Sequence, residues 1–317
     1  QNHVTATKGS DKIKFTRAVD LAPEKVQGFC DEHELTLTAS LDDAYNDPDI
    51  DAVVLITPHT QHADQVVAGA AAGKHILTEK PFALKKADGL RAAKAMTDAG
   101  LTLGIGHNYR YGAAVWEMKQ IIESGKLGDI HHIEGNLSHQ GQIGIEGWRR
   151  AHDEAPTGGI VHFGAHIIDI MCWFGGPMRE VYAQLESHIL PADVGSVLTR
   201  FENGTTGYLA NLMTTPASFH LQVMGSEGWA RANGWLDTNK VVTCFGAGKV
   251  EESGGVTEEL ELPIRDIYSQ IRANDENFAA ACLGQEPYLF TPEEMAHTAA
   301  IHEAIAKSAE SGLPTAV

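Results

Sequence analysis

Residues 52–81 read A-V-V-L-I-T-P-H-T-Q-H-A-D-Q-V-V-A-G-A-A-A-G-K-H-I-L-T-E-K-P, and this stretch decides the fold. The apolar run from Ala52 to Ile56 predicts a strand that is buried on both faces, as in a parallel sheet. Apolar spacing predicts a helix from about Gln61 to Ala72, and His75 to Thr78 predicts a second strand. A strand, a helix and a strand in succession are typical of a parallel sheet with right-handed crossovers.

The same alternation extends to both sides of this stretch. Strands are predicted over residues 13–19 and 101–105, and helices over 23–33 and 85–99. Residues 1–110 are therefore expected to form a doubly wound parallel sheet of the Rossmann type, an α/β fold. The first strand and the glycine-rich loop of such a sheet are absent from the sequence. We expect both ahead of Gln1, because Asp20 would then lie about 20 residues beyond the glycines, where a ribose-binding carboxylate stands.

The second half of the chain has a different pattern, and residues 111–317 are expected to form a second domain. Helices are predicted over 113–124, 266–282 and 292–311, and strands over 130–137, 181–189, 195–201, 205–213 and 220–224. Asn203-Gly204 is typical of a tight turn between two strands. This pattern indicates an α+β domain with an open, mostly antiparallel sheet that carries helices on one face.

The residues directly after each parallel strand are the first candidates for ligand contact, because ligands bind beyond the carboxyl ends of such strands. A carboxylate at Asp20 is expected to bond the ribose hydroxyls and to favour NAD over NADP. The alternative for Asp20 is to cap the helix that comes next. The remaining candidate cofactor contacts are Thr57, Pro58, His62, Glu79, Lys80 and Asn108.

A second motif lies between Gly158 and Gly176 and reads G-G-I-V-H-F-G-A-H-I-I-D-I-M-C-W-F-G-G. If it forms one α-helix, His162, His166 and Asp169 share one face, because they are spaced at i, i+4 and i+7. The opposite face is apolar, and buried polar groups need partners. Three interpretations are open: a polar seam bonded to backbone, a zinc site, or a face that contacts a substrate and moves a proton.

Composition narrows the classes of function. The 317 residues carry a net charge of −18, which argues against nucleic acid or an anionic membrane surface as a partner. The four cysteines form no C-x-x-C pair, which is typical of reduced thiols in a cytoplasmic protein. We find no apolar run of membrane-spanning length and no signal peptide in the sequence.

Four motifs in order resemble the glucose–fructose oxidoreductase / inositol dehydrogenase / rhizopine-catabolism (Gfo/Idh/MocA) family. They are Thr57-Pro58 with His62, then Glu79-Lys80-Pro81, then Gly159 to Asp169, and the closing segment from Phe278 to Val317; Gln1-Asn2-His3 resembles the residues just after the family's glycine loop. The resemblance implies an NAD(P)-dependent oxidoreductase that acts on a sugar, a polyol or a related cyclic hydroxy or aldehyde compound. It also implies a homodimer or homotetramer that forms through the sheet of the second domain.

The resemblance further implies roles for individual residues. Lys80 and His166 would lie beside the nicotinamide and the reacting carbinol, with His166 as general acid/base, Lys80 assisting and Asp169 orienting the site. The family's first aspartate of the helix motif is His162 here, so the substrate is left open. The expected substrate contacts are Arg110, Trp148, Arg149, His162 and Asp169. No residue is assigned to a metal.

Three other functions stay open at this point. One is an NAD-dependent glycosidase or lyase of the same family, which would release a sugar without net formation of NADH. Another is a metal-dependent enzyme that uses His162, His166 and Asp169. The third is a dinucleotide or ligand sensor without catalysis. The Trp148-Arg149-Arg150 run shapes a substrate pocket under the dehydrogenase hypothesis, and otherwise forms an exposed cation–π cluster.

Overall fold

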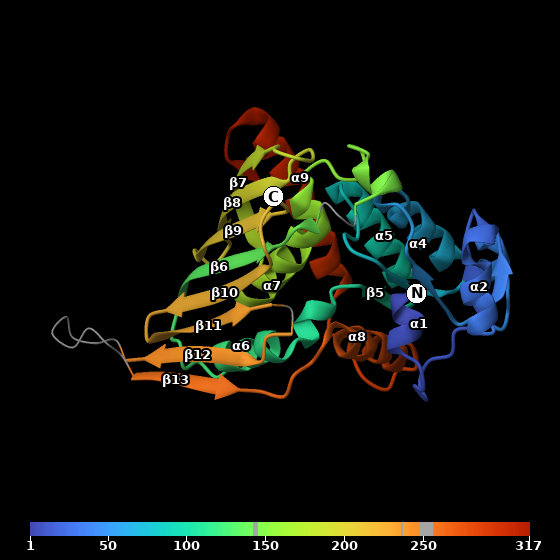
Figure 1. Ribbon diagram of the computed structural model, residues 1–317, viewed down its shortest axis with the longest axis horizontal. Coiled ribbons are helices and arrows are strands. Elements are labelled where there is room, and N and C mark those ends of the chain that lie inside the picture. Colours follow the sequence, from blue (N-terminus) through green and yellow to red (C-terminus); the bar gives the residue numbers. More distant parts are fainter. Residues whose placement is uncertain (142–144, 236, 247–255) are drawn as a thin grey trace.

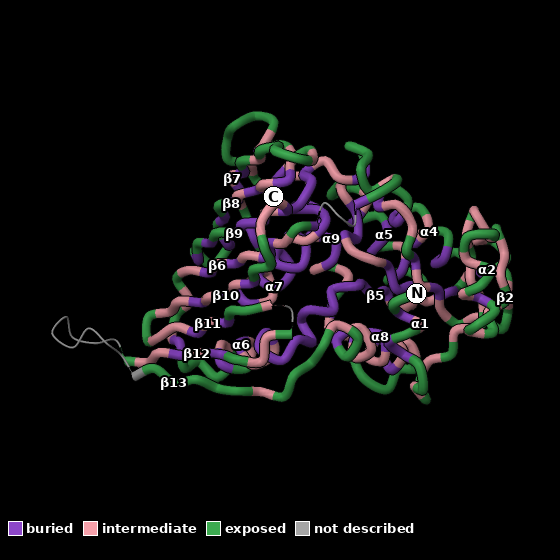
Figure 2. The backbone as a smooth tube through the Cα atoms, viewed as in Figure 1, coloured by how far each residue is buried: buried purple, intermediate pink, exposed green. Residues whose placement is uncertain are grey.

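Two halves, each built on a different kind of sheet, make up the chain (Figure 1). The computed structural model describes residues 1–141, 145–235, 237–246 and 256–317. Figure 2 shows that the buried segments lie mainly between the two kinds of sheet, where β5, α7 and α9 meet, while the peripheral loops are exposed. The residues of interest for function come from this interior and its rim.

The first half holds the parallel strands that the sequence predicts. Its strands are β1 (Arg17–Val19), β2 (Thr36–Thr38), β3 (Ala52–Leu55), β4 (His75–Thr78) and β5 (Leu103–Ile105), and its helices are α1 (Asn2–Ala6), α2 (Pro23–Glu32), α3 (Leu41–Tyr45), α4 (His62–Ala71) and α5 (Lys86–Asp98). Every pairing among these strands is parallel, which confirms the Rossmann-like α/β class.

Three details of this half differ from the prediction. The described strands form two sheets, β1-β2 and β3-β4-β5, instead of one. The first strand begins at Arg17 and not at residue 13. Strand β2 and helix α3 were not predicted, because three and five residues are too few to show a period. The expected strand and glycine loop ahead of Gln1 stay a prediction.

A nine-stranded sheet organises the second half. Its order is β13-β12-β11-β10-β6-β9-β8-β7-β14, and among the pairings of its described residues only β6–β9 is parallel, so the mostly antiparallel prediction is confirmed. The strands are β6 (Ile130–Ser138), β7 (Met178–Glu186), β8 (Val194–Phe201), β9 (Thr206–Leu212), β10 (Ser218–Gly225), β11 (Gly228–Gly234), β12 (Lys240–Phe245), β13 (Val256–Glu261) and β14 (Thr315–Ala316). The sequence patterns did not predict the last four strands, β11 to β14.

The strand predicted over residues 181–189 ends earlier than expected. Strand β7 stops at Glu186, and the loop after it closes on Asp193, whose carboxylate accepts hydrogen bonds from the backbone N–H groups of His188, Ile189 and Leu190 at 2.9, 2.6 and 2.8 Å. This side chain satisfies the backbone donors that a longer strand would have offered to a neighbour.

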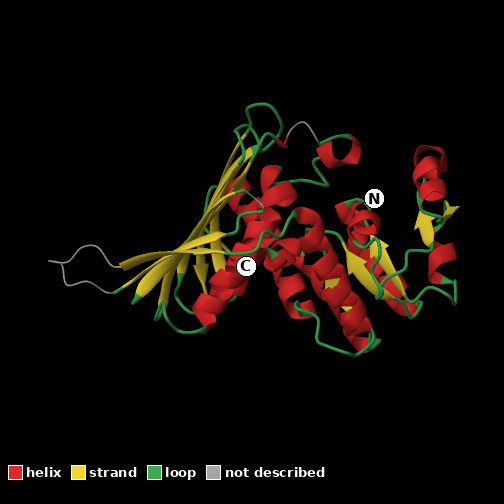
Figure 3. Ribbon diagram, turned by 60° about the horizontal axis from the view of Figure 1, so that its bottom comes forward, coloured by secondary structure: helices red, strands yellow, loops and turns green. Residues whose placement is uncertain are grey.

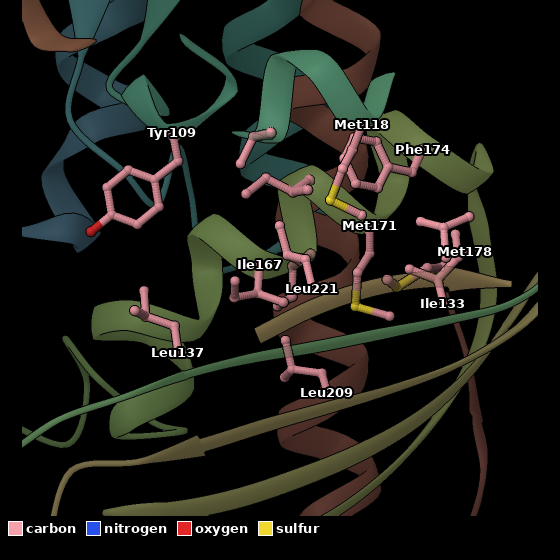
Figure 4. Packing of buried hydrophobic residues seen from close by; sticks show 14 of the residues in the cluster. Tyr109, Met118, Ile133, Leu137, Ile167, Met171, Phe174, Met178, Leu209 and Leu221 are labelled. Atoms are coloured by element: carbon pink, nitrogen blue, oxygen red, sulfur yellow. The ribbon is translucent and has the colours of Figure 1, made fainter. Parts of the chain in front are cut away.

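Helices cover one face of the large sheet (Figure 3). They are α6 (Ala113–Glu123), α7 (Ala165–Gly175) and α9 (Pro292–Ser311). Figure 4 shows Ile167 and Met171 of α7 packed against Leu209 of β9 and Leu221 of β10. This apolar interface fixes the position of α7, and therefore of the polar side chains that α7 carries toward the first half.

The last two helices connect the halves. Helix α8 (Ile267–Cys282) packs against α1, and α9 packs against α5 of the first half and β7 of the second. The α5–α9 contact is close, since a Cβ atom added at Gly89 would lie 2.9 Å from the Cβ of Ala299. The domain boundary expected between residues 110 and 111 stays a prediction. Within the described ranges, every helix is too short or too polar to span a bilayer.

Candidate active site

The loops after β3 and β4 are joined by a buried histidine. His62 lies with Nδ1 at 2.9 Å from the carbonyl oxygen of Pro81 and Nε2 at 3.0 Å from that of Thr57. Its side chain is fully buried. His62 therefore has two backbone partners and connects the two loops through them. The sequence predicted that His62 contacts the cofactor.

A second buried histidine, His3 of α1, lies between two carboxylates. Its Nδ1 is 2.8 Å from Oδ2 of Asp275 on α8, and its Nε2 is 3.2 Å from Oε1 of Glu79. Burial disfavours charge on His3, but the hydrogen bonds and charges of the two carboxylates outweigh it and raise the pKa of His3 to about 10. Burial acts against charge on Glu79 too, yet the bond from His3 lowers its pKa to about 2. Glu79, a predicted cofactor contact, thus ties α1 to the loop after β4.

This charged cluster predicts a pH-dependent stability. The pKa of His3 is raised above its unfolded value of 6.5, so its contribution is complete below that pH and disappears as pH rises through about 10. Between pH 7 and 9 we expect the free energy of unfolding to fall by about 2 kcal/mol relative to a His3→Gln variant. Urea unfolding at several pH values measures this difference. A His131→Gln variant, changed at an exposed position of β6, serves as the control; parallel curves for wild type and His3→Gln would contradict the assignment.

Lys80 connects the loop after β4 to the second half of the chain. Its Nζ donates a hydrogen bond to the carbonyl oxygen of His162 and lies 5.8 Å from the ring centre of Phe163. Burial lowers the pKa of Lys80 to about 8; the carboxylate of Glu79 opposes this shift and the charge of Arg149 adds to it. Lys80 is therefore mostly protonated at neutral pH, but it loses its proton at a lower pH than an ordinary lysine does.

The segment after Gly159 is not one continuous α-helix, and the prediction of a single helix is wrong in its first turn. Ile160–Gly164 forms a π-helix, and α7 begins at Ala165. A π turn is wider than an α turn, so the i, i+4, i+7 spacing no longer aligns the three polar side chains. Gly158 before it has φ of 50°, and a Cβ there would lie 2.3 Å from the carbonyl oxygen of Ala192. Only glycine fits this approach.

The three polar residues of this segment face different neighbours. His162 lies with its ring 6.2 Å from the ring of His59, and burial lowers its pKa to about 4. His166 faces His107, and Asp169 pairs with Arg110. Among the described residues, no three His, Cys, Asp or Glu side chains are arranged to hold a metal ion. The geometry therefore offers no argument for a metal-dependent enzyme.

Arg110 and Asp169 form a buried, bidentate ion pair. Nε of Arg110 donates to Oδ2 of Asp169 at 2.9 Å, and Nη2 donates to Oδ1 at 2.7 Å. The guanidinium also lies 4.1 Å from the ring centre of Phe290. Arg110 is 1% exposed and Asp169 2%. Both residues were predicted to contact the substrate. In the structure, the charged groups of these two residues bind each other.

His166 is enclosed by aromatic rings. Its Nδ1 lies 3.5 Å from Nδ1 of His107, and its ring stacks on Tyr109 with 4.0 Å between ring centres. Burial and the nearby Lys80 lower its pKa well below 6.5, so His166 is neutral at pH 7. Sequence reasoning did not single out His107 or Tyr109, although both stand directly after β5, where ligand contacts were expected.

A small hollow opens beside the π-helical turn. His162 and Arg149 line it together with apolar residues that include Met213 and Pro191. Trp148 lies nearby, with its ring edge-on to the ring of His59 at 5.0 Å between ring centres. The guanidinium of Arg149 lies 4.3 Å from the centre of the Trp148 ring. The structure thus brings three of the predicted substrate contacts, His162, Trp148 and Arg149, close together, whereas Asp169 pairs with Arg110.

Two further cofactor candidates lie at the carboxyl ends of β1 and β5. Asp20 accepts a hydrogen bond from the backbone N–H of Ala22 at 2.8 Å, and Ala22 itself is the residue that precedes α2. Asp20 therefore stabilises the turn before the helix without being its cap. The amide of Asn108 donates to Gln270 of α8 at 3.3 Å.

Comparison with known proteins adds to this geometry. Residues 1–107 match the oxidoreductase family with an NAD-binding Rossmann fold, and residues 115–231 match the GFO/IDH/MocA C-terminal domain. The 1,5-anhydro-D-fructose reductase of Ensifer adhaerens is 34% identical over 199 residues, which are 60% of this chain and 59% of the reductase. The oxidoreductase YrbE of Bacillus subtilis is 26% identical over 73% of this chain and 70% of its own length. A structure of levoglucosan dehydrogenase with NADH superposes with a TM-score of 0.87 at 22% identity, over 100% of this chain and 95% of that one; this likeness shows the fold.

Proposed function

The chain belongs to the Gfo/Idh/MocA oxidoreductase family, and from that premise we propose that it is an NAD-dependent dehydrogenase acting on a sugar, a polyol or a related cyclic hydroxy or aldehyde compound. One observation carries this proposal. Lys80, from the loop after β4, is bonded to the turn that leads into His166, and its charge is close enough to lower the pKa of that neutral imidazole. Alcohol oxidation needs a base for the hydroxyl proton, and a cation beside the same oxygen stabilises its developing negative charge.

The carboxyl ends of the parallel strands fit a dinucleotide. Asp20 has one carboxylate oxygen bonded to Ala22, and the other has no hydrogen-bond partner among the described residues. Beside it, Leu21 is 90% exposed, and Ile56 after β3 is 48% exposed. An acceptor for ribose hydroxyls next to exposed apolar side chains suits an adenosine group. We assign NAD as the preferred cofactor, because a carboxylate at Asp20 repels a 2′-phosphate.

The preference for NAD predicts the behaviour of an Asp20→Ser variant. We expect its Kd for NADH to rise about 10-fold, the size of one lost charge-assisted hydrogen bond, while binding of NADPH improves. Fluorescence titration with NADH and NADPH measures both constants. Asp31→Ser on α2, whose carboxylate accepts only a bond from Gln27 among the described contacts, is the matched control. An unchanged NADH/NADPH ratio in Asp20→Ser would remove the ribose assignment.

The protonation states support a division of roles. At pH 7 His166 is neutral and Lys80 is mostly an ammonium ion. NAD⁺, when bound, supplies the hydride acceptor. His166 takes the proton of the substrate hydroxyl, and Lys80 donates a hydrogen bond to the same oxygen and stabilises its developing negative charge. The predicted roles of Glu79, His62 and Asp169 become positioning roles: they hold the loops and α7 that present Lys80 and His166.

Substrate binding is proposed in the hollow beside His162. Arg149 and Trp148 offer the hydrogen bonds and the ring face with which proteins bind hydroxylated rings. A panel of sugars, polyols and cyclic aldehydes with NAD⁺ or NADH tests the class by absorbance. Release of a free sugar without net NADH would favour the glycosidase or lyase alternative. Binding of NADH without turnover of any compound would favour a sensor.

Two further properties are proposed for the whole protein. Its outer sheet face carries exposed Leu198 and Tyr208 at 54% and 37% exposure, and we propose that a second copy pairs with this face to form a homodimer or homotetramer. All four cysteines are free, which is compatible with the cytoplasmic location that the sequence predicted.

A further inference from the structure

The only hydrogen bond that His166 makes within the described residues joins it to another histidine. Nδ1 of His166 and Nδ1 of His107 are 3.5 Å apart, and the two rings are nearly perpendicular at 79°. Both side chains are buried, at 6% and 2% exposure. In most enzymes that use a histidine as a base, a carboxylate takes this orienting position. Here the nearby carboxylate of Asp169 is bonded at both oxygens by Arg110.

Two neutral imidazoles that face each other through Nδ1 have to share one proton between them. One ring donates from Nδ1–H and the other accepts with a lone pair. If His166 is the donor, its Nε2 carries the lone pair that a base needs. If His107 is the donor, Nε2 of His166 carries a proton and is blocked as a base.

We propose that His107 is a positioning residue that accepts the Nδ1–H of His166 and thereby holds Nε2 of His166 as the proton acceptor. This inference rests on the proposed function. In the oxidation, the O–H bond of the substrate breaks and its proton forms a bond to Nε2 of His166, while the carbinol hydride passes to NAD⁺. The resulting imidazolium keeps its Nδ1–H bond to His107, which stabilises the charge in a buried place.

Each of the two imidazole rings also lies against an aromatic ring. The ring of His107 lies with its centre 6.3 Å from that of Phe290, and the ring of His166 stacks on Tyr109. Because Tyr109 stands two residues after His107, one short segment after β5 supplies both the stacking ring and the acceptor. Tyr109 therefore fixes the plane of the His166 ring, and His107 fixes its tautomer.

Three variants separate the acceptor from its packing. His107→Phe keeps a ring and removes the acceptor, and we expect kcat at pH 7 to fall about 10- to 100-fold with little change in KM. His107→Asn keeps an oxygen near the Nδ1 position and is expected to retain kcat within about 5-fold. Phe290→Leu loosens the packing on the other face of His107 and keeps the acceptor, so kcat is expected to stay within the same range.

A readout that needs no turnover accompanies the kinetics. In ¹⁵N-labelled protein, the imidazole nitrogen shifts of His166 show which nitrogen carries the proton. We expect Nδ1–H in the wild type, in His107→Asn and in Phe290→Leu, and a move toward Nε2–H in His107→Phe. A wild-type His166 protonated at Nε2, or an unchanged tautomer in His107→Phe, overturns the proposal. If no compound is oxidised, the proposed function fails while the tautomer is still measured, so the two failures are distinguishable.

Discussion

A Lys80→Met variant is expected to lose about 10³-fold in kcat for alcohol oxidation at pH 7, while its Kd for NADH stays within a few-fold of wild type. Methionine keeps the length of the side chain and removes the ammonium group that we propose to contact the reacting oxygen. The hydrogen bond that Nζ donates to the carbonyl oxygen of His162 is lost with it. Steady-state kinetics and NADH fluorescence titration measure the two quantities.

The pKa of Lys80 gives the same prediction a second test. Because it is about 8, kcat/KM for oxidation is expected to decline as pH rises through that value in wild type, when the ammonium group loses its proton. Lys94→Met is the matched control, since Lys94 is exposed on α5 and paired with Asp98. Turnover of Lys80→Met within 10-fold of Lys94→Met would remove Lys80 from the mechanism.

The second large effect concerns the Arg110–Asp169 pair. Asp169→Leu is expected to destabilise the protein by about 3–5 kcal/mol, because it removes the bidentate partner of the buried guanidinium and leaves only the longer contact of Nη1 with Glu294 at 3.5 Å. Arg110→Met is expected to cost a similar amount for the reverse reason. The double variant should be less destabilised than either single one, because two apolar side chains remove both charges from the interior. Urea unfolding of the wild type and the three variants completes a double-mutant cycle.

This cycle also separates a structural role from substrate binding. If Arg110 and Asp169 serve mainly to hold α7 against the segment after β5, the double variant regains stability, and its KM for substrate changes less than its kcat. Simple addition of the two single effects would contradict the pairing. A stable double variant with a KM raised by more than about 100-fold would restore the predicted substrate contact.

Much of the architecture follows from local sequence patterns. The run Ala52 to Ile56 and the helical spacing after it predicted β3 and α4 within a few residues, because a strand buried on both faces has to be apolar throughout. Short elements escaped prediction: β2 has three residues, and β14 has two. The π-helical turn escaped it too, since one inserted residue per turn leaves no trace in the residue types.

For the candidate site, sequence and tertiary structure each determined a different part. By itself, the sequence pointed to Lys80 through its place after a parallel strand, because the order of the elements fixes where the carboxyl ends of such strands lie. It pointed to His166 through the motif between Gly158 and Gly176, and the roles expected of both residues came from the family resemblance. Only the tertiary structure decided what each group faces. His3 meets Asp275 across 272 positions, and Arg110 meets Asp169 across 59. Such partners are set by how helices and strands pack, and packing depends on the whole chain at once, so no local spacing records it.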